Sequence, residues 1–92
     1  MRYTVDFSNR AARFVRKQTK SNRKKIGRAA EKLADSPRPA GAKKLADSGY
    51  WRIRVRDFRL VYEIRDGVAL VLVVLVGRRS DVYEILRRIQ KP

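Results

Sequence analysis

The sequence contains no cysteine and no histidine, and these absences exclude several kinds of chemistry. Without cysteine the chain can form no disulfide, no thiolate nucleophile and no zinc–thiolate site. Without histidine it can be neither a His-based ribonuclease nor a hydrolase with a His-containing triad. Acidic residues are also few, with only 9 Asp and Glu, so we expect no metal site and no cofactor.

Long hydrophobic segments are missing as well. The longest apolar run covers residues 68–76, well short of the roughly 20 residues that a helix needs to cross a bilayer. Residues 1–6 lack the features of a signal peptide. We therefore expect a cytoplasmic protein that makes no use of a membrane.

Basic residues, in contrast, are abundant. The chain has 24 Lys and Arg in 92 residues and a formal net charge of +15. Self-repulsion among these charges opposes folding, so stability does not explain them. A polyanionic partner would explain them, and the candidates are RNA, DNA, the ribosome or an acidic protein. The length predicts a single domain that spans residues 1–92.

The first half of the sequence predicts a strand followed by two helices. A short strand is expected over residues 3–7, and Ser8 can cap a helix that runs to about Thr19. Ser21 or Asn22 can cap a second helix, which carries a clear amphipathic stripe. The Ser-Pro-Arg-Pro sequence then ends this helix, because proline cannot continue it.

The second half predicts three strands and a final helix. Residues 50–55 and 58–64 alternate in polarity, and Asp66-Gly67 favours a turn with positive φ after them. The run 68–76 is apolar on both faces, so we expect it in the middle of the sheet. Residues 81–84 have capping-box spacing for the last helix. The predicted fold class is α+β in the order β-α-α-β-β-β-α, a small antiparallel sheet packed by an N-terminal helical hairpin and a C-terminal helix.

Arginine occupies every second position of the first strand of this predicted meander. Successive side chains of a strand point to opposite faces, so these guanidinium groups share one face. More arginines begin the next strand and follow the last one, and a tyrosine comes shortly after them. If the strands pair in order, the groups form one surface suited to phosphates. Four or five guanidinium groups and a phenol would share it, and the candidates are Arg52, Arg54, Arg56, Arg59, Arg78, Arg79 and Tyr83.

The most demanding use of such a surface is RNA cleavage. Attack of a ribose 2′-OH on the adjacent phosphate needs a proton acceptor, stabilisation of the phosphorane charge and a proton donor for the leaving oxygen. Tyr83 is the conspicuous neutral group, and it could take part in proton transfer or stack on a base. The arginines placed to stabilise the charge are Arg52, Arg54, Arg59 and Arg79.

Simpler interpretations stay open for each of these residues. The arginines could be only the solvated face of a half-buried sheet, and Tyr83 could be a packing residue on the flank of its helix. Tyr62 and Trp51 are better explained as core residues than as base-stacking residues. The remaining basic residues could be solvated, or they could bind RNA or the ribosome. These candidates are Lys20, Arg23, Lys24, Lys25, Arg28, Lys43, Lys44, Arg56 and Arg78.

The chain resembles the RelE family of toxin–antitoxin toxins, within the RelE/ParE superfamily. The resemblance rests on several segments in order, and it extends to the N-terminal strand, the two helices and the Asp-Ser-Pro sequence that follows them. Its segments are Lys44-Leu45, the Tyr-Trp-Arg-Ile-Arg-Val of 50–55, the Phe-Arg-Leu-Val-Tyr of 58–62, the Val-Gly-Arg-Arg of 76–79 and the Asp-Val-Tyr of 81–83.

This resemblance implies an mRNA interferase that cuts mRNA in the ribosomal A site without metal and leaves a 2′,3′-cyclic phosphate. It implies that Arg59 and Arg79 stabilise phosphate charge and that Tyr83 stacks on the substrate or helps to deprotonate it. Arg52 and Arg54 stand where family members often carry lysine. Arginine stays protonated, so these two residues would be poor general bases.

The resemblance also implies partners. A cognate acidic antitoxin would cover the basic face or displace the C-terminal helix. The ribosome, with its rRNA and mRNA, would be the target, and operator DNA would be bound only through the antitoxin. Two alternatives stay open at this point. One is a ParE-like inhibitor of DNA gyrase, and the other is a non-catalytic, degenerate RNA-binding homologue.

Overall fold

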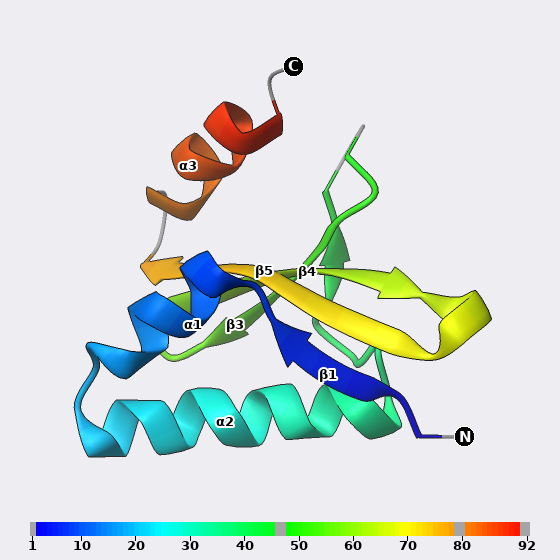
Figure 1. Ribbon diagram of the computed structural model, residues 1–92, viewed down its shortest axis with the longest axis horizontal. Helices are drawn as coiled ribbons and strands as arrows, with labels where there is room; N and C mark the ends of the chain where they lie inside the picture. Colours follow the sequence, from blue (N-terminus) through cyan, green and yellow to red (C-terminus); the bar gives the residue numbers. More distant parts are fainter. Residues whose placement is uncertain (1, 46–47, 79–80, 91–92) are drawn as a thin grey trace.

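The computed structural model describes residues 2–45, 48–78 and 81–90, which form one sheet with helices on both of its faces (Figure 1). The predicted order of elements is confirmed, with one short additional strand. The elements are β1 (Thr4–Phe7), α1 (Asn9–Arg16), α2 (Lys20–Asp35), β2 (Lys43–Lys44), β3 (Trp51–Val55), β4 (Phe58–Arg65), the 3-10 turn η1 (Asp66–Val68), β5 (Leu70–Arg78) and α3 (Asp81–Gln90).

The sheet has five strands in the order β1-β5-β4-β3-β2. The meander of β3, β4 and β5 is antiparallel, as the sequence predicts. β5 lies inside the sheet, which confirms the central place expected for the apolar run. Two features go beyond the prediction. β1 pairs with β5 in parallel, and the loop before β3 contains the two-residue strand β2.

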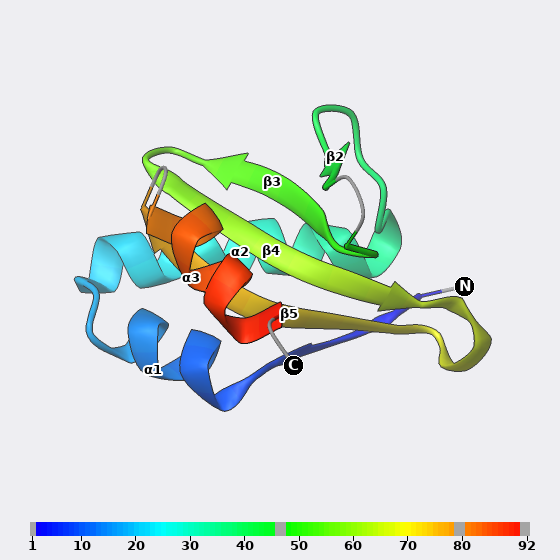
Figure 2. The same ribbon diagram turned by 90° about the horizontal axis from the view of Figure 1, so that it is seen from above.

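The two faces of the sheet are covered by different helices. The hairpin of α1 and α2 lies on one face, and α3 crosses the other face above β4 and β5 (Figures 1 and 2). The hairpin side holds the larger core, which includes Ile26, Leu33, Phe58, Leu60 and Tyr62. This placement confirms Tyr62 as a core residue, and Trp51 packs against the edge of the same core. The α3 side holds a smaller core made of Val61, Leu75, Val82 and Leu86.

A register shift opposite Val61 and Tyr62 places Val73 and Leu75 of β5, which are two residues apart, in different cores. Regular alternation already sends neighbouring side chains to opposite faces of a strand. Here Val61 pairs with Leu75, whereas Tyr62 pairs with Val73, so β5 has one extra residue at this point. Such a bulge bends a strand and increases its twist.

Side-chain caps fix the starts of both hairpin helices. Ser8 caps α1, as predicted, by accepting a hydrogen bond from the N–H of Ala11 (3.1 Å). Its hydroxyl also donates to the carbonyl of Val74 (2.8 Å), which joins the start of the helix to the sheet. The expected cap of α2 at Ser21 or Asn22 is wrong. Thr19 caps this helix by accepting from the N–H of Asn22 (3.1 Å), so α1 ends earlier than expected.

The turn between β4 and β5 also differs from the prediction. Asp66 and Gly67 lie in a 3-10 turn, and the positive φ falls on Ala69 (φ 49°) rather than on the glycine. The Asp66 carboxylate accepts hydrogen bonds from the Tyr3 hydroxyl and from the Arg38 guanidinium. These contacts hold Asp66 in place, and tertiary structure therefore decides the conformation of the turn.

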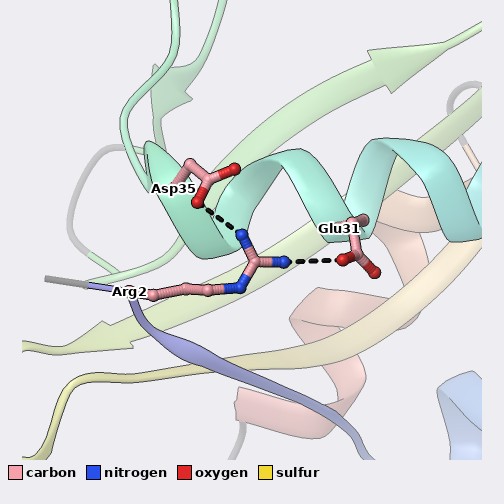
Figure 3. Close-up of polar contacts among 3 residues, drawn as sticks. All are labelled: Arg2, Glu31 and Asp35. Carbon is pink, nitrogen blue, oxygen red and sulfur yellow. Dashed lines mark hydrogen bonds and ion pairs between the residues drawn. The ribbon is translucent and has the colours of Figure 1, made fainter.

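Arg2 forms two ion pairs that join the segment before β1 to the last turns of α2 (Figure 3). Its guanidinium donates to Glu31 Oε1 (2.6 Å) and to Asp35 Oδ1 (2.5 Å). The N–H of Tyr3 donates to the carbonyl of Ala34 (2.7 Å) beside this clamp. The charged groups are exposed, so each pair adds little to stability. Together these contacts mainly determine the position of β1 relative to the end of α2.

Candidate functional site

The site begins with a row of residues across the three antiparallel strands. Arg54 on β3 stands directly opposite Arg59 on β4, and Arg59 stands opposite Gly77 on β5. The neighbouring row of Arg52, Val61 and Leu75 faces the same way. Val61 and Leu75 belong to the core under α3. The predicted shared face of Arg52, Arg54 and Arg59 is therefore present, and it is the α3 side of the sheet.

Arg52 lies deeper than the sequence suggests. It is only 5% exposed, although the alternating pattern predicts an accessible side chain. Its Nε atom is buried and has no hydrogen-bond partner among the described residues. A buried N–H donor without a partner is costly, because its lost hydrogen bond to water is not replaced.

Within the described part of the chain, no acidic side chain pairs with Arg52, Arg54 or Arg59. The ion pairs that form there use other basic residues. Arg54 is exposed and Arg59 is half-buried. Like charges directly opposite each other on two strands are destabilising. The row therefore holds positive charge that the described residues leave uncompensated.

Arg56 and Arg78 do not share this face, which corrects the expectation from the sequence. β3 ends at Val55, and Arg56 stands in the following turn with φ at 58°. Arg78 pairs in register with Phe58, and its guanidinium carbon lies 4.6 Å from the centre of the Phe58 ring. It also donates to Asp57 (3.1 Å). Because Phe58 belongs to the hairpin-side core, Arg78 lies on the opposite face from Arg54 and Arg59.

Gly77 allows α3 to approach the sheet closely. A β-carbon at this position would lie 2.7 Å from Cγ2 of Val82. Contacts this short do not occur between real side chains, so with any larger residue Val82 or the helix that carries it would have to shift. Val82 is fully buried. Tyr83 follows it directly, so the missing side chain of Gly77 helps to set the position of Tyr83.

Arg52, Arg54 and Arg59 share the α3 side of the sheet, which we call the arginine face. Tyr83 is half-buried on α3, the helix that lies over this side. Val82, Ile85 and Leu86 form the apolar stripe of α3, and Tyr83 stands beside it rather than in it. Asp81 and Glu84 occupy the first turn of α3, where negative charge favours the helix dipole. The remaining predicted site residue, Arg79, lies outside the described residues.

A groove of about 740 Å³ lies between α2 and the outer edge of β3. We call it the α2–β3 groove. Seven cationic side chains and several small apolar residues line it, and no acidic residue does so among those described. Two of the cations, Arg52 and Arg54, also belong to the arginine face. The full cationic set is Lys25, Arg28, Lys32, Lys43, Arg52, Arg54 and Arg56.

The groove gathers some of the predicted RNA- or ribosome-binding residues and omits others. Lys25, Arg28, Lys43 and Arg56 line it, whereas Lys20, Arg23, Lys24, Lys44 and Arg78 do not. Lys32 also lines the groove and is not among the predicted residues. This residue follows Lys25 and Arg28 at helical spacing, so the pattern i, i+3, i+7 on α2 would have indicated it.

Two further kinds of feature bear on possible functions. Within the described residues, none of the helices is both long and apolar enough to cross a membrane. In the same part of the chain, no three Asp, Glu, His or Cys residues come together as metal ligands would.

Comparison with known proteins supplies the family. The sequence model of the family described as "ParE toxin of type II toxin-antitoxin system, parDE" matches residues 2–83. The mRNA interferase toxin RelE of Escherichia coli K12 is 33% identical, and the match covers 97% of this chain and 99% of the relative.

Solved structures agree with this relationship. A double mutant of E. coli toxin RelE in the free state superposes with a TM-score of 0.80 at 31% identity, covering 97% of this chain and 99% of that one. The toxin–antitoxin complex RelBE2 of Mycobacterium tuberculosis contains a chain that matches with a TM-score of 0.76 at 27% identity, covering 86% and 100%. This chain belongs to the RelE/ParE family of toxins of type II toxin–antitoxin systems and is RelE-like.

Proposed function

We propose that this toxin is a ribosome-dependent mRNA endonuclease that cuts in the A site without a metal ion. The observation that carries the proposal is the pair Arg54 and Arg59, which stand directly opposite each other on the α3 face. No acidic partner meets them among the described residues. This repulsion costs up to roughly 1 kcal/mol. A phosphate bound between the two guanidinium groups would turn the repulsion into attraction.

In the proposed reaction, the ribose 2′-oxygen attacks the adjacent phosphorus and the 5′-oxygen of the next nucleotide leaves. Arg54 and Arg59 stabilise the charge that develops on the phosphorane. Arg52 adds positive charge from a buried position, which strengthens its field. Arg79 also stabilises this charge, and Tyr83 stacks on a base or relays a proton. The products are a 2′,3′-cyclic phosphate and a free 5′-hydroxyl.

The ribosome has a specific part in this proposal. The arginines stay protonated, so none of them is a good general base. The toxin therefore depends on the ribosome to hold the mRNA in a reactive geometry, and positioning of this kind can supply a large share of a rate enhancement. The action takes place in the cytoplasm, where the basic surface contacts rRNA. A cognate acidic antitoxin silences the toxin and carries the complex to operator DNA.

Primer extension on a defined mRNA, with and without ribosomes, tests the proposal. We expect cuts only with ribosomes, and we expect Arg59→Ala to lose at least about a hundredfold in rate, as for other groups that stabilise developing charge. Arg59→Lys tests whether charge alone is enough. Arg16→Ala is the matched control, because it removes an exposed arginine from α1 on the other side of the sheet. Equal cleavage by Arg59→Ala and Arg16→Ala would refute the proposal.

The description of the matching family as ParE favours a second candidate, inhibition of DNA gyrase. A supercoiling assay with purified gyrase distinguishes the two. Inhibited supercoiling together with no cleavage of ribosome-bound mRNA would establish the gyrase function. Activity in neither assay would indicate a degenerate homologue that only binds nucleic acid.

A further inference from the structure

One carboxylate lies close to the arginine face along the chain. Asp57 is the single acidic residue within residues 50–62. It stands in the two-residue turn that joins β3 to β4, three residues after Arg54 and two before Arg59. Carboxylates form strong charge-assisted hydrogen bonds with guanidinium groups. A carboxylate at this position could therefore pair with one of the two arginines and reduce the positive charge that they offer to a phosphate.

The structure directs the Asp57 carboxylate away from both of them. Its Oδ2 atom accepts a hydrogen bond from Nη1 of Arg78 (3.1 Å). Arg78 lies on the hairpin side of the sheet, under α1 and α2, because it stands in register with the core residue Phe58. Asp57 is thus bound to an arginine of the opposite face from Arg54 and Arg59.

Arg78 is itself well anchored. Its guanidinium carbon lies 4.6 Å from the centre of the Phe58 ring, a distance at which a cation is attracted to an aromatic ring. The Phe58 ring is buried and meets the ring of Phe14 edge to face, with 6.0 Å between their centres and 80° between their planes. Arg78 therefore joins the exposed turn to a packed part of the larger core.

Packing does not fix the direction of the Asp57 side chain, which is 70% exposed. Without Arg78, the carboxylate has an alternative partner in Arg59. The Arg59 guanidinium turns back along β4 and donates to the carbonyl of Phe58 (3.4 Å), the residue between Arg59 and Asp57. Elsewhere on β4, Arg65 pairs with Glu63 at 2.8 Å, so an arginine can reach a carboxylate two residues before it.

We propose that Arg78 is a positioning residue, which holds the carboxylate of Asp57 on the hairpin side and so keeps the Arg54–Arg59 pair available to a phosphate. The inference rests on the proposed nuclease function. It gives Arg78 a different role from the RNA contact that the sequence predicts. Arg78 touches neither the substrate nor the reacting atoms, and it acts through Asp57.

Cleavage of ribosome-bound mRNA by three variants tests this role. We expect Arg78→Gln to lower kcat/KM about fivefold, because a phosphate must then displace the carboxylate from Arg59, and an exposed ion pair corresponds to roughly this factor. Asp57→Asn should leave cleavage unchanged. The double variant Arg78→Gln/Asp57→Asn should recover the original rate, since no carboxylate is left to compete.

Two control variants accompany these measurements. Arg78→Lys keeps the positive charge beside Asp57 and should retain most of the activity. Arg38→Gln is the matched control, because Arg38 also pairs with a turn aspartate, Asp66 (3.0 Å), and lies 5.5 Å from the centre of an aromatic ring, that of Trp51. This second pair stands at the other end of β4, so Arg38→Gln should leave cleavage unchanged.

The double variant separates the proposal from its alternatives. If it cleaves as slowly as Arg78→Gln, then Arg78 contacts the RNA directly and the proposal is wrong. If Asp57→Asn alone is as slow as Arg78→Gln, the ion pair serves to hold the turn in shape, which would also overturn the proposal.

Nuclear magnetic resonance of the arginine Nε–H groups gives a measurement that needs neither ribosome nor mRNA. We expect the Arg59 signal to shift in Arg78→Gln and to return to its original position in the double variant. A signal that stays in place in Arg78→Gln would overturn the proposal. A toxin that shows the expected shifts but cuts no mRNA would refute the nuclease function while leaving the placement of Asp57 by Arg78 intact.

Thermal unfolding checks that each variant is folded. If Arg78→Gln does not fold, Arg78→Met replaces it in the single and double variants, because the methionine side chain can still cover the Phe58 ring without carrying a charge.

Discussion

The two faces of the sheet use the same strands in different ways. Under α1 and α2, the side chains of β3, β4 and β5 form a continuous apolar core that includes Phe58, Leu60 and Tyr62. Under α3, the next residues along β3 and β4 include Arg52, Arg54 and Arg59, and the described residues form only a small core of four buried side chains there. One face therefore secures the fold, and the other leaves room for a partner.

Truncating a buried side chain should change stability by different amounts on the two faces, and this is the largest effect that we expect. Leu33→Ala removes a fully buried side chain under the hairpin, and we expect a loss of about 2–5 kcal/mol in the free energy of unfolding. Leu86→Ala alters the small core under α3 and should cost about 1–2 kcal/mol, because a helix resting on one small cluster can relax. Urea unfolding of both variants measures the difference. Equal losses would contradict the division of roles between the faces.

A substitution at Gly77 should affect the α3 face alone. We expect Gly77→Ala to cost about 1–3 kcal/mol, because its β-carbon collides with Val82 and lifts α3. Cleavage should fall as well, since Tyr83 moves with the helix. Amide exchange in α3 should accelerate while exchange in α2 stays the same. Gly27→Ala is the control, because a β-carbon at Gly27 meets open space.

The pH dependence of stability should reflect the burial of Tyr62 in the core under α1 and α2. Burial raises the pKa of Tyr62 to about 12, compared with about 10 for an exposed tyrosine. The stabilisation associated with the protonated phenol is therefore complete below about pH 10 and is lost as the pH rises through about 12. Tyr62→Phe should lack this alkaline loss. It should also cost about 1 kcal/mol at neutral pH, because the hydroxyl donates to the carbonyl of Pro37.

Urea unfolding at a series of alkaline pH values makes this measurement. Tyr50→Phe is the control variant, because the Tyr50 side chain is only partly buried, at the edge of the α3-side core. Parallel pH profiles for Tyr62→Phe and the unmodified protein would show that Tyr62 does not couple to folding in this range.

Much of this architecture follows from local patterns in the sequence. Alternation in 50–55 and 58–64 predicts the meander, and Ser8 predicts the start of α1. These features depend on a few neighbouring residues, so the sequence is sufficient to find them. The shared face of Arg54 and Arg59 follows too, because strand pairing preserves the alternation.

Other features depend on contacts between distant segments. The conformation of the turn at Asp66 is set by Tyr3 and Arg38, which a local reading of Asp-Gly does not include. The alternating pattern does not indicate that Arg52 is buried, and the need for glycine at position 77 appears only once α3 is packed on the sheet. The α2–β3 groove likewise exists only because a helix and a strand from separate parts of the chain lie together.

The parallel pairing of β1 with β5 has a consequence for the order of folding. Thr4 through Phe7 find their partners in Leu70 through Val73, and the hydroxyl of Ser8 reaches a carbonyl 66 residues away. During synthesis the first strand and the hairpin emerge well before the strand that completes their core. Pairing between strands that lie so far apart in the sequence is slow and occurs late in folding. A nascent toxin therefore has no arginine face until most of its chain has been made, and the antitoxin has that interval in which to accumulate.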